Sequence, residues 1–167
     1  MKRAAFILIC LIIFSCSDNQ EKKFTLDPLK SIEIGIASLA RSSEGNYNFN
    51  IYMINHQPVS GIQLELKPSK TYTVDSVSTI GQRINKDDDF SIHNNDSGTI
   101  LLFSMSGSKI DESDTYDKNR NSILRVFTKL RDKDTALPPD SIWVQSIIAN
   151  AKGKKLESTS IAYQLGK

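Results

Sequence analysis

Few side chains in this sequence have the type and spacing needed for chemistry. Histidine occurs only as His56 and His93. A hydrolase needs a nucleophile beside a base, and metal catalysis needs several converging ligands. No motif of either kind surrounds the two histidines, so both are interpreted as surface residues. We therefore predict no catalytic residue and no cofactor, and the protein is not expected to be an enzyme.

One acidic loop is spaced in part like a calcium site. In "DKNRNSILRVFT", Asp117, Asn119 and Asn121 occupy alternating positions. A calcium loop of this type also needs a glycine at its sixth position and a bidentate glutamate at its twelfth. Ser122 and Thr128 stand at those positions instead. A solvated turn is the preferred interpretation, with calcium binding by the first three residues as the alternative.

The start of the chain, "MKRAAFILICLIIFSC", has the pattern of an export signal. Lys2 and Arg3 form a positive head, and residues 4–14 form an apolar run that ends before Ser15. A membrane-spanning helix needs about 20 apolar residues, so this run is too short to be one. A positive head, a short apolar stretch and a small residue before the cut are typical of a signal peptide, here residues 1–15.

The end of that stretch, "IFSC", resembles the lipobox of bacterial lipoproteins. The resemblance implies cleavage before Cys16 and a diacylglyceryl group on its sulfur, with residues 16–30 as a flexible tether. Two or more acyl chains give stable membrane anchoring. The following "SDNQE" resembles the acidic surface-export signal of Bacteroidota lipoproteins. The expected location is the cell envelope, in the outer membrane, with surface exposure left open; the alternative is an ordinary secretory signal with an incidental cysteine.

Cysteine and charge counts exclude several classes of protein. Cys10 lies within the signal, so the processed chain keeps only Cys16 and has no internal disulfide and no thiolate metal site. Loss of Lys2 and Arg3 lowers the number of basic residues from 21 to 19, which equals the number of acidic residues. No basic stripe remains to attract nucleic acid. The membrane is expected to be contacted through the lipid anchor only.

Residues 31–167 are predicted to form one domain in which a period of two dominates. Apolar residues alternate with polar ones in short segments, as is typical of strands with one buried face. The nine segments are 32–36, 47–53, 62–66, 71–78, 89–93, 98–105, 122–130, 140–148 and 158–165. Many short strands without crossover helices predict an all-β, jelly-roll-like sandwich of two sheets.

The order of these segments is similar to that of a cohesin-type module. The resemblance rests on "FNIYMINHQPVSGIQLEL", "YTVDSVSTIG", "GTILLFSMSGSKI" and "NSILRVFTKL". It implies a nine-stranded jelly roll that binds a protein partner, a dockerin in well-studied cases, through one flat sheet face. Strands near 63–66, 89–93 and 100–105 would form that face. The loop "SKIDESDTYDKNRNSIL" is longer and more acidic than the short glycine-rich turn usual in related modules.

The segment "ILLFSM" is apolar on both sides, which indicates either cover by other structure or a binding patch. We assign Leu101, Phe103 and Met105 to the core, so that Ile100 and Leu102 point to the opposite side. Cover by a loop or packing at the sandwich edge is the preferred interpretation of these two side chains, and a binding patch is the alternative. The predicted partner-binding residues are Tyr52, Gln63, Glu65, His93, Ile100 and Leu102.

A carbohydrate-binding module on a related sandwich is the alternative function. Such modules expose flat aromatic side chains, and Trp143 and Tyr52 are the candidates here. Trp143 alternates with Ile142 and Val144, so a partly buried edge position is the preferred interpretation. A small hydrolase or an enzyme accessory ranks below both. The main prediction is a lipid-anchored, non-catalytic module that holds a protein partner or a surface polysaccharide at the cell envelope.

Overall fold

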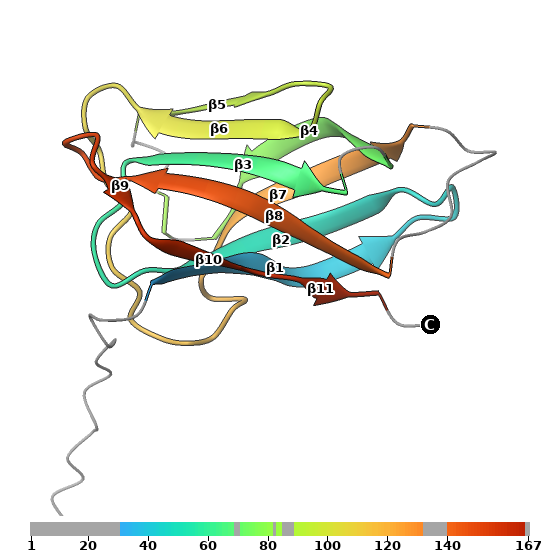
Figure 1. Ribbon diagram of the computed structural model, residues 1–167, viewed down its shortest axis with the longest axis horizontal. Coiled ribbons are helices and arrows are strands. Elements are labelled where there is room, and N and C mark those ends of the chain that lie inside the picture. The colour runs from blue at the N-terminus through green and yellow to red at the C-terminus, as the bar shows by residue number, and fades with distance from the viewer. Residues whose placement is uncertain (1–30, 69–70, 82, 85–88, 132–139, 166–167) are drawn as a thin grey trace, which may run out of the picture.

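A computed structural model describes residues 31–68, 71–81, 83–84, 89–131 and 140–165, which form strands and no helix (Figure 1). No part of these ranges is a helix long and apolar enough to span a membrane. The signal peptide, Cys16 and the tether lie outside the described residues. In chain order, the strands are β1 (Ile32–Arg41), β2 (Tyr47–Ile54), β3 (Gly61–Lys67), β4 (Tyr72–Thr79), β5 (Phe90–Asn94), β6 (Thr99–Ser104), β7 (Ser122–Leu130), β8 (Ser141–Ala149), β9 (Lys155–Leu156), β10 (Ser158–Ile161) and β11 (Tyr163–Gln164).

The strands form two sheets that pack face to face (Figure 1). The first sheet has the order β10-β1-β2-β7-β4, and the second has the order β11-β8-β3-β6-β5, with β9 also paired to β8. The β1–β10 pair is parallel, and the other described strand pairs are antiparallel. This architecture confirms the predicted all-β sandwich.

The nine predicted segments correspond to the observed strands with one division and one addition. The segment 158–165 divides, because β10 pairs with β1 in the first sheet whereas β11 pairs with β8 in the second. The added strand, β9, is only two residues long, which is too short for alternation to reveal. The chain therefore crosses between the sheets after Ile161 and closes one side of the sandwich.

The alternating apolar residues of β1, β2 and β3 fill the core, as predicted. They are Ile32, Ile34, Ile36, Tyr47, Phe49, Ile51, Met53, Ile62, Leu64 and Leu66, and all are buried. Burying one such side chain contributes roughly 1.5–3 kcal/mol. A one-residue slip of β3 would turn Glu65 into the core, so the register of this strand is strongly set.

The prediction for β6 has the two sides of the strand reversed. Ile100 and Leu102 are each 1% exposed, whereas Leu101 is 37% exposed and Met105 is 82% exposed. Pairing with β3 sets this phase, because Leu102 lies opposite the buried Ile62 and directly opposed residues share one side of a sheet. The assignment of Ile100 and Leu102 to partner binding is therefore wrong, since both side chains belong to the core.

Tyr52 is buried as well, although it points away from the core side of β2. Its ring lies over Gly35, where a Cβ atom would stand 2.9 Å from Tyr52 Cε1. Its hydroxyl donates to Glu33 Oε1 at 2.5 Å, and the Lys118 ammonium lies 5.0 Å from the ring centroid. Burial, and then the hydrogen bond to Glu33, raise the pKa of Tyr52. The assignment of Tyr52 to partner or sugar binding is therefore wrong.

The long loop between β6 and β7 is tied to the end of β2 by a buried polar network. Asn55 and Asn121 are almost fully buried. The Arg83 guanidinium donates to Oδ1 of both side chains. It also donates to the backbone carbonyls of Met53 and Asp111. Burial lowers the pKa of Arg83. One cation therefore fixes three segments that are far apart in the sequence.

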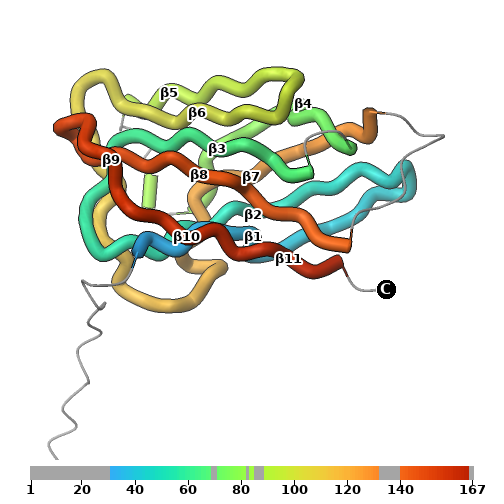
Figure 2. The backbone as a smooth tube through the Cα atoms, in the orientation of Figure 1, coloured from blue at the N-terminus to red at the C-terminus, as the bar shows by residue number. Residues whose placement is uncertain are grey.

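Figure 2 shows which loops share one end of the sandwich. The start of β1 lies at the same end as the β2–β3 connection, the β6–β7 loop and the turn that follows β8. We call this the loop end. The end of β11 lies at the opposite end of the molecule. The chain thus enters the domain beside the loops rather than beside the β1–β2 hairpin.

Candidate functional site

The outer side of the second sheet gathers most of the exposed apolar side chains. The large apolar side chains exposed among the described residues are Leu101, Met105, Tyr116, Trp143 and Ile147. All except Tyr116 lie on β6 or β8 or directly after β6. We call the solvent side of this sheet the second-sheet face. It also carries Gln63, Glu65, His93 and Phe103.

Strand register brings the central residues of the second-sheet face into one row. Gln63 lies opposite Leu101 on one side and opposite Ile147 on the other, and Leu101 lies opposite His93. Directly opposed side chains are about 4.5–5.5 Å apart at Cβ, so these four are in contact range. Phe103, two residues further along β6, stacks on His93 with ring centroids 5.8 Å apart. The face therefore has an apolar centre interrupted by one amide.

Glu65 and Lys67 on this face form an ion pair. Lys67 Nζ lies 2.6 Å from Glu65 Oε1, and both side chains are partly exposed. Solvated pairs of this kind contribute little to stability. Lys67 also lies opposite Trp143, whose 36% exposure leaves part of the indole available at the edge of the sheet. The rim is therefore polar and close to neutral around the aliphatic centre.

The turn that carries Met105 is held by Asp89. The Asp89 carboxylate accepts hydrogen bonds from Ser104 Oγ at 2.5 Å and from the backbone nitrogen of Ser106 at 2.8 Å. Hydrogen bonds from Ser104 and then Ser106 lower the pKa of Asp89 to about 2. The carboxylate is therefore ionised across the neutral range, and the turn it shapes leaves Met105 pointing into solvent.

The second-sheet face contains part of the predicted site. The predicted residues that lie on it are Gln63, Glu65, His93 and Trp143. Those that do not are Tyr52, Ile100 and Leu102. The prediction missed Leu101, Met105 and Ile147. For Ile147 a signal was present, because its neighbour Ile148 continues the inward alternation of β8 and so turns Ile147 outward.

The strand arrangement can be compared with known proteins. No protein-family model and no curated protein matches the sequence. A cohesin of Clostridium acetobutylicum, in complex with a dockerin, is similar with a TM-score of 0.56 and 9% identity over 81% of this chain and 100% of that chain. A cohesin of Acetivibrio cellulolyticus, also in complex with a dockerin, gives 0.53 and 14% over 80% and 98%. A type I cohesin–dockerin complex of Clostridium thermocellum gives 0.52 and 11% over 84% and 98%. The chain folds as a cohesin-like domain.

The cohesin-like fold agrees with the resemblance found in the sequence. The four motifs that carried it correspond to β2 with β3, to β4, to β6 and to β7. The strands predicted to share one face, β3, β5 and β6, are neighbours in the second sheet. At 9–14% identity the shared property is the fold, so the function of this domain is argued from its own side chains.

In the loop predicted as an alternative calcium site of the cohesin-like domain, the candidate ligand side chains form hydrogen bonds within the loop. Asp117 Oδ1 accepts from the backbone nitrogens of Asn119 and Arg120 at 2.8 and 3.2 Å. The Asn121 amide donates to the carbonyls of Thr115 and Asp117, both at 2.8 Å. These side chains shape a turn in which Asp117 and Asn119 are exposed, whereas Asn121 is buried, so only part of the loop is the solvated turn that was preferred. In the ranges that the structure describes, no group of three or more His, Cys, Asp or Glu residues is placed to hold a metal ion.

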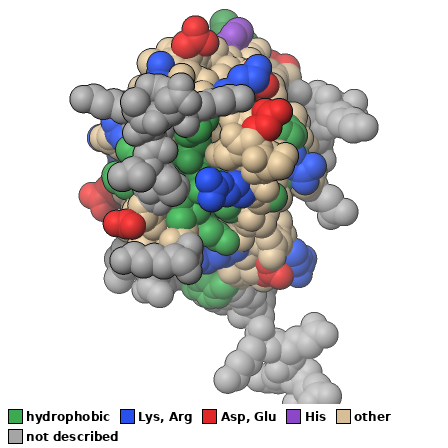
Figure 3. All heavy atoms as spheres, turned by 90° about the vertical axis from the view of Figure 1, so that its right-hand side faces the viewer, with side chains coloured by type: hydrophobic (Ala, Val, Ile, Leu, Met, Phe, Trp, Pro, Cys, Tyr) green, Lys and Arg blue, Asp and Glu red, His purple; other side chains and the backbone are tan. Residues whose placement is uncertain are grey.

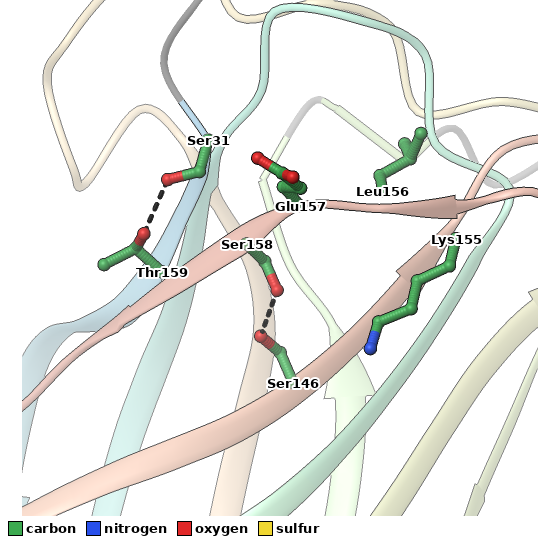
Figure 4. Close-up of a pocket in the computed structure, with 7 residues that line it drawn as sticks. All are labelled: Ser31, Ser146, Lys155, Leu156, Glu157, Ser158 and Thr159. Atoms are coloured by element: carbon green, nitrogen blue, oxygen red, sulfur yellow. Dashed lines mark hydrogen bonds between the residues drawn. The ribbon is translucent and has the colours of Figure 1, made fainter.

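A polar pocket of about 630 Å³ lies in the seam between the two sheets. It is lined by Ser31, Ser146, Lys155, Leu156, Glu157, Ser158 and Thr159 (Figure 4). Ser31 bonds to Thr159 at 2.5 Å, and Ser146 bonds to Ser158 at 2.9 Å. Strands β8 and β10 are not paired by a backbone ladder. The hydrogen bond between the Ser146 and Ser158 hydroxyls therefore links the two strands across the seam. We assign these hydroxyls a structural role.

Charge is mixed at the end of the cohesin-like domain opposite the loop end. Figure 3 views that end, where blue and red side chains are interspersed on the described surface. A mixed surface creates no strong field of one sign. The described surface in this view therefore has no patch of a single sign of charge, such as the basic patches that attract nucleic acid.

Proposed function

We propose that this protein is a non-catalytic module that holds a protein partner, dockerin-like or other, on the second-sheet face. The observation that carries the proposal is the gathering of Leu101, Met105, Trp143 and Ile147 on one side of one sheet. An apolar centre with a polar rim is the usual anatomy of a protein interface. The similar cohesins are each in complex with a dockerin, which is consistent with a partner at a face of this fold.

The chemistry of the face favours a protein over a polysaccharide. Sugar-binding surfaces rely on exposed aromatic rings, and among the residues that the structure describes Trp143 is the only large aromatic side chain exposed on the second-sheet face. Its predicted companion Tyr52 is buried on the other sheet. Leu101 and Ile147 are aliphatic and occupy the centre. An aliphatic centre suits the apolar side chains of a protein partner.

Affinity capture tests this proposal. The full-length chain with a C-terminal tag is used to capture proteins from its source cells, beside a polysaccharide-binding screen. Ile147→Asp places a charge at the centre of the face. We expect it to weaken binding of the captured protein at least about 30-fold, the size of an interface hot spot. Ser78→Asp, an exposed position on β4 of the first sheet, is the matched control and should bind as the parent chain does.

Two results would overturn the proposal. One is saturable polysaccharide binding without recovery of any specific protein. The other is a captured protein that binds the Ile147→Asp and parent chains equally well.

We further propose that a lipid on Cys16 holds the domain at the outer membrane. The lipobox-like "IFSC" supports this proposal. Cys16→Ser removes the acylated sulfur, so we expect the protein to move from the membrane fraction to the soluble fraction, because membrane anchoring requires the acyl chains. Cys10→Ser, within the signal, is the control and should leave the distribution unchanged. An unaltered membrane fraction for Cys16→Ser would refute the anchor.

A further inference from the structure

A small pocket at the loop end adjoins the second-sheet face. It has a volume of about 240 Å³ and is lined by Gln57, Pro58, Lys109, Asn150, Ala151 and Lys152. Sites for small molecules usually measure about 300–1,000 Å³, so this one suits a single side chain better than a whole ligand. We call it the lysine pocket.

The lysine pocket continues the second-sheet face in the chain and in space. Residues 150–152 directly follow Ala149, the last residue of β8, and Pro58 shortly precedes Gly61, the first residue of β3. Ala149 and Gly61 lie opposite one another in the sheet. Lys109 follows β6 by a few residues, beyond the exposed Met105. A partner seated on the face thus reaches the pocket without crossing to another surface.

One wall of the pocket is fixed by the turn after β8. The Asn150 side chain accepts hydrogen bonds from the backbone nitrogens of Lys152 at 3.0 Å and Lys154 at 3.1 Å. The backbone of Asn150 also accepts from Gly153 at 2.9 Å, and Gly153 has a φ of 72°, which favours glycine. The position of Lys152 is therefore set by the fold of the turn.

The opposite wall is fixed by a bridge between two loops. Val59 and Ile110 exchange backbone hydrogen bonds of 3.0 and 2.7 Å, which join the two loops that carry Pro58 and Lys109. The Ser60 nitrogen donates to the Ala149 carbonyl at 3.0 Å and ties this wall to β8. Both walls exist before any partner binds, so little ordering is needed on binding.

The charge of the lysine pocket is unbalanced. Lys109 and Lys152 are exposed, and neither ammonium has a carboxylate within 4.0 Å among the residues that the structure describes. This contrasts with Lys67 on the face, which pairs with Glu65. It also contrasts with the seam pocket, whose hydroxyls bond to one another (Figure 4). Pro58 and Ala151 add apolar surface between the two cations.

We propose that the lysine pocket receives an apolar side chain of the protein partner together with an adjacent carboxylate. The apolar group contacts Pro58 and Ala151, and the carboxylate pairs with Lys109 and Lys152. This inference rests on the proposed function, because it specifies the chemistry of the partner held on the second-sheet face. The partner is an acidic protein segment at this end of the interface.

A blocked dipeptide tests the pocket without the partner. Acetyl-Leu-Glu-amide is titrated into the full-length, isotope-labelled chain in detergent micelles, with acetyl-Leu-Gln-amide as the neutral isostere. We expect saturable shifts of the Lys109, Ala151 and Lys152 amide signals, with the Gln probe binding about two- to fivefold more weakly, as for exposed ion pairs. Lys109→Gln/Lys152→Gln should show the same loss. Lys129→Gln, an exposed lysine on the first sheet, should show none.

The results separate this inference from the proposed function. Equal binding of the two probes, shifts outside the pocket, or no saturable shift up to the solubility of the probe would each overturn the inference. Capture of a partner that Ile147→Asp abolishes but Lys109→Gln/Lys152→Gln leaves unchanged would also overturn the inference and leave the function standing. Probe binding at the pocket, together with saturable polysaccharide binding and no captured protein, would overturn the function, and the pocket would then be left without the protein partner that the inference requires.

Discussion

Replacing Leu102 by alanine is expected to lower the free energy of unfolding by about 2–5 kcal/mol, because it opens a cavity in a packed core. The same change at the adjacent Leu101 is expected to cost less than about 0.5 kcal/mol, as for ordinary surface substitutions. The two residues are identical in chemistry and consecutive in β6, but Leu102 faces the core and Leu101 faces solvent. The comparison therefore isolates the direction in which each side chain points.

Urea unfolding of the full-length chain and the two variants measures this difference. A larger loss of stability for Leu101→Ala than for Leu102→Ala would mean that β6 has the opposite phase, and similar losses would mean that both side chains are buried; either result would contradict the account. In either case Leu101 would not be available to a partner, and the second-sheet face would lose its centre.

Replacing Arg83 by methionine is expected to lower the free energy of unfolding by about 2–4 kcal/mol. Methionine keeps the apolar stem but removes the donor to Asn121 Oδ1 and leaves Asn55 Oδ1 with only the hydroxyl of Ser113 at 3.3 Å. A buried polar group left unsatisfied costs about 1–3 kcal/mol. The matched control is Arg125→Met, which removes an exposed guanidinium that bonds Asn50 Oδ1 at 3.2 Å, with an expected cost below about 0.5 kcal/mol.

Hydrogen exchange shows whether Arg83 acts on the loop in particular. The backbone nitrogen of Ser113 donates to the Asn55 carbonyl at 2.9 Å, so its exchange reports attachment of the β6–β7 loop to β2. We expect this amide to exchange faster in Arg83→Met, while amides in the centre of β2 keep their relative protection. Equal stability of the two arginine variants with unchanged Ser113 exchange would show that the network does not hold the loop.

Strands with one apolar side could be predicted well from the sequence. In β3, Ile62 and Leu64 alternate with Gln63 and Glu65, and only one phase keeps the charges out of the core. The same reasoning holds for β1 and β2. Since these strands and the turns between them dominate the chain, the sandwich followed from local pattern. The grouping of β3, β5 and β6 in one sheet was instead implied by the resemblance to cohesin-type modules.

The orientation of β6 could not be obtained from its own residues. Ile100, Leu101, Leu102 and Phe103 are all apolar, so both phases bury a hydrophobic set. The pairing with β3 decides between them, and that pairing joins residues far apart in the sequence. A similar limit applies to Tyr52, whose cover by Gly35 and Lys118 depends on a cross-strand neighbour and a distant loop.

The lysine pocket could not be predicted from local sequence patterns either. Its walls come from three connections, represented by Pro58, Lys109 and Lys152, and no spacing in the sequence links them. Their proximity results from the Val59–Ile110 bridge and from the end of β8. Sites built from loop ends depend on how the sheets stack, which a strand pattern does not specify.

Methyl NMR of the full-length chain bound to its captured partner tests the central claim most directly. The account predicts that the methyl signals of Leu101 and Ile147 shift on binding, while that of Thr73 on the outer side of the first sheet does not. A shift of the Thr73 signal with unchanged Leu101 and Ile147 signals would contradict the account, because the partner would then bind the first sheet instead of the second.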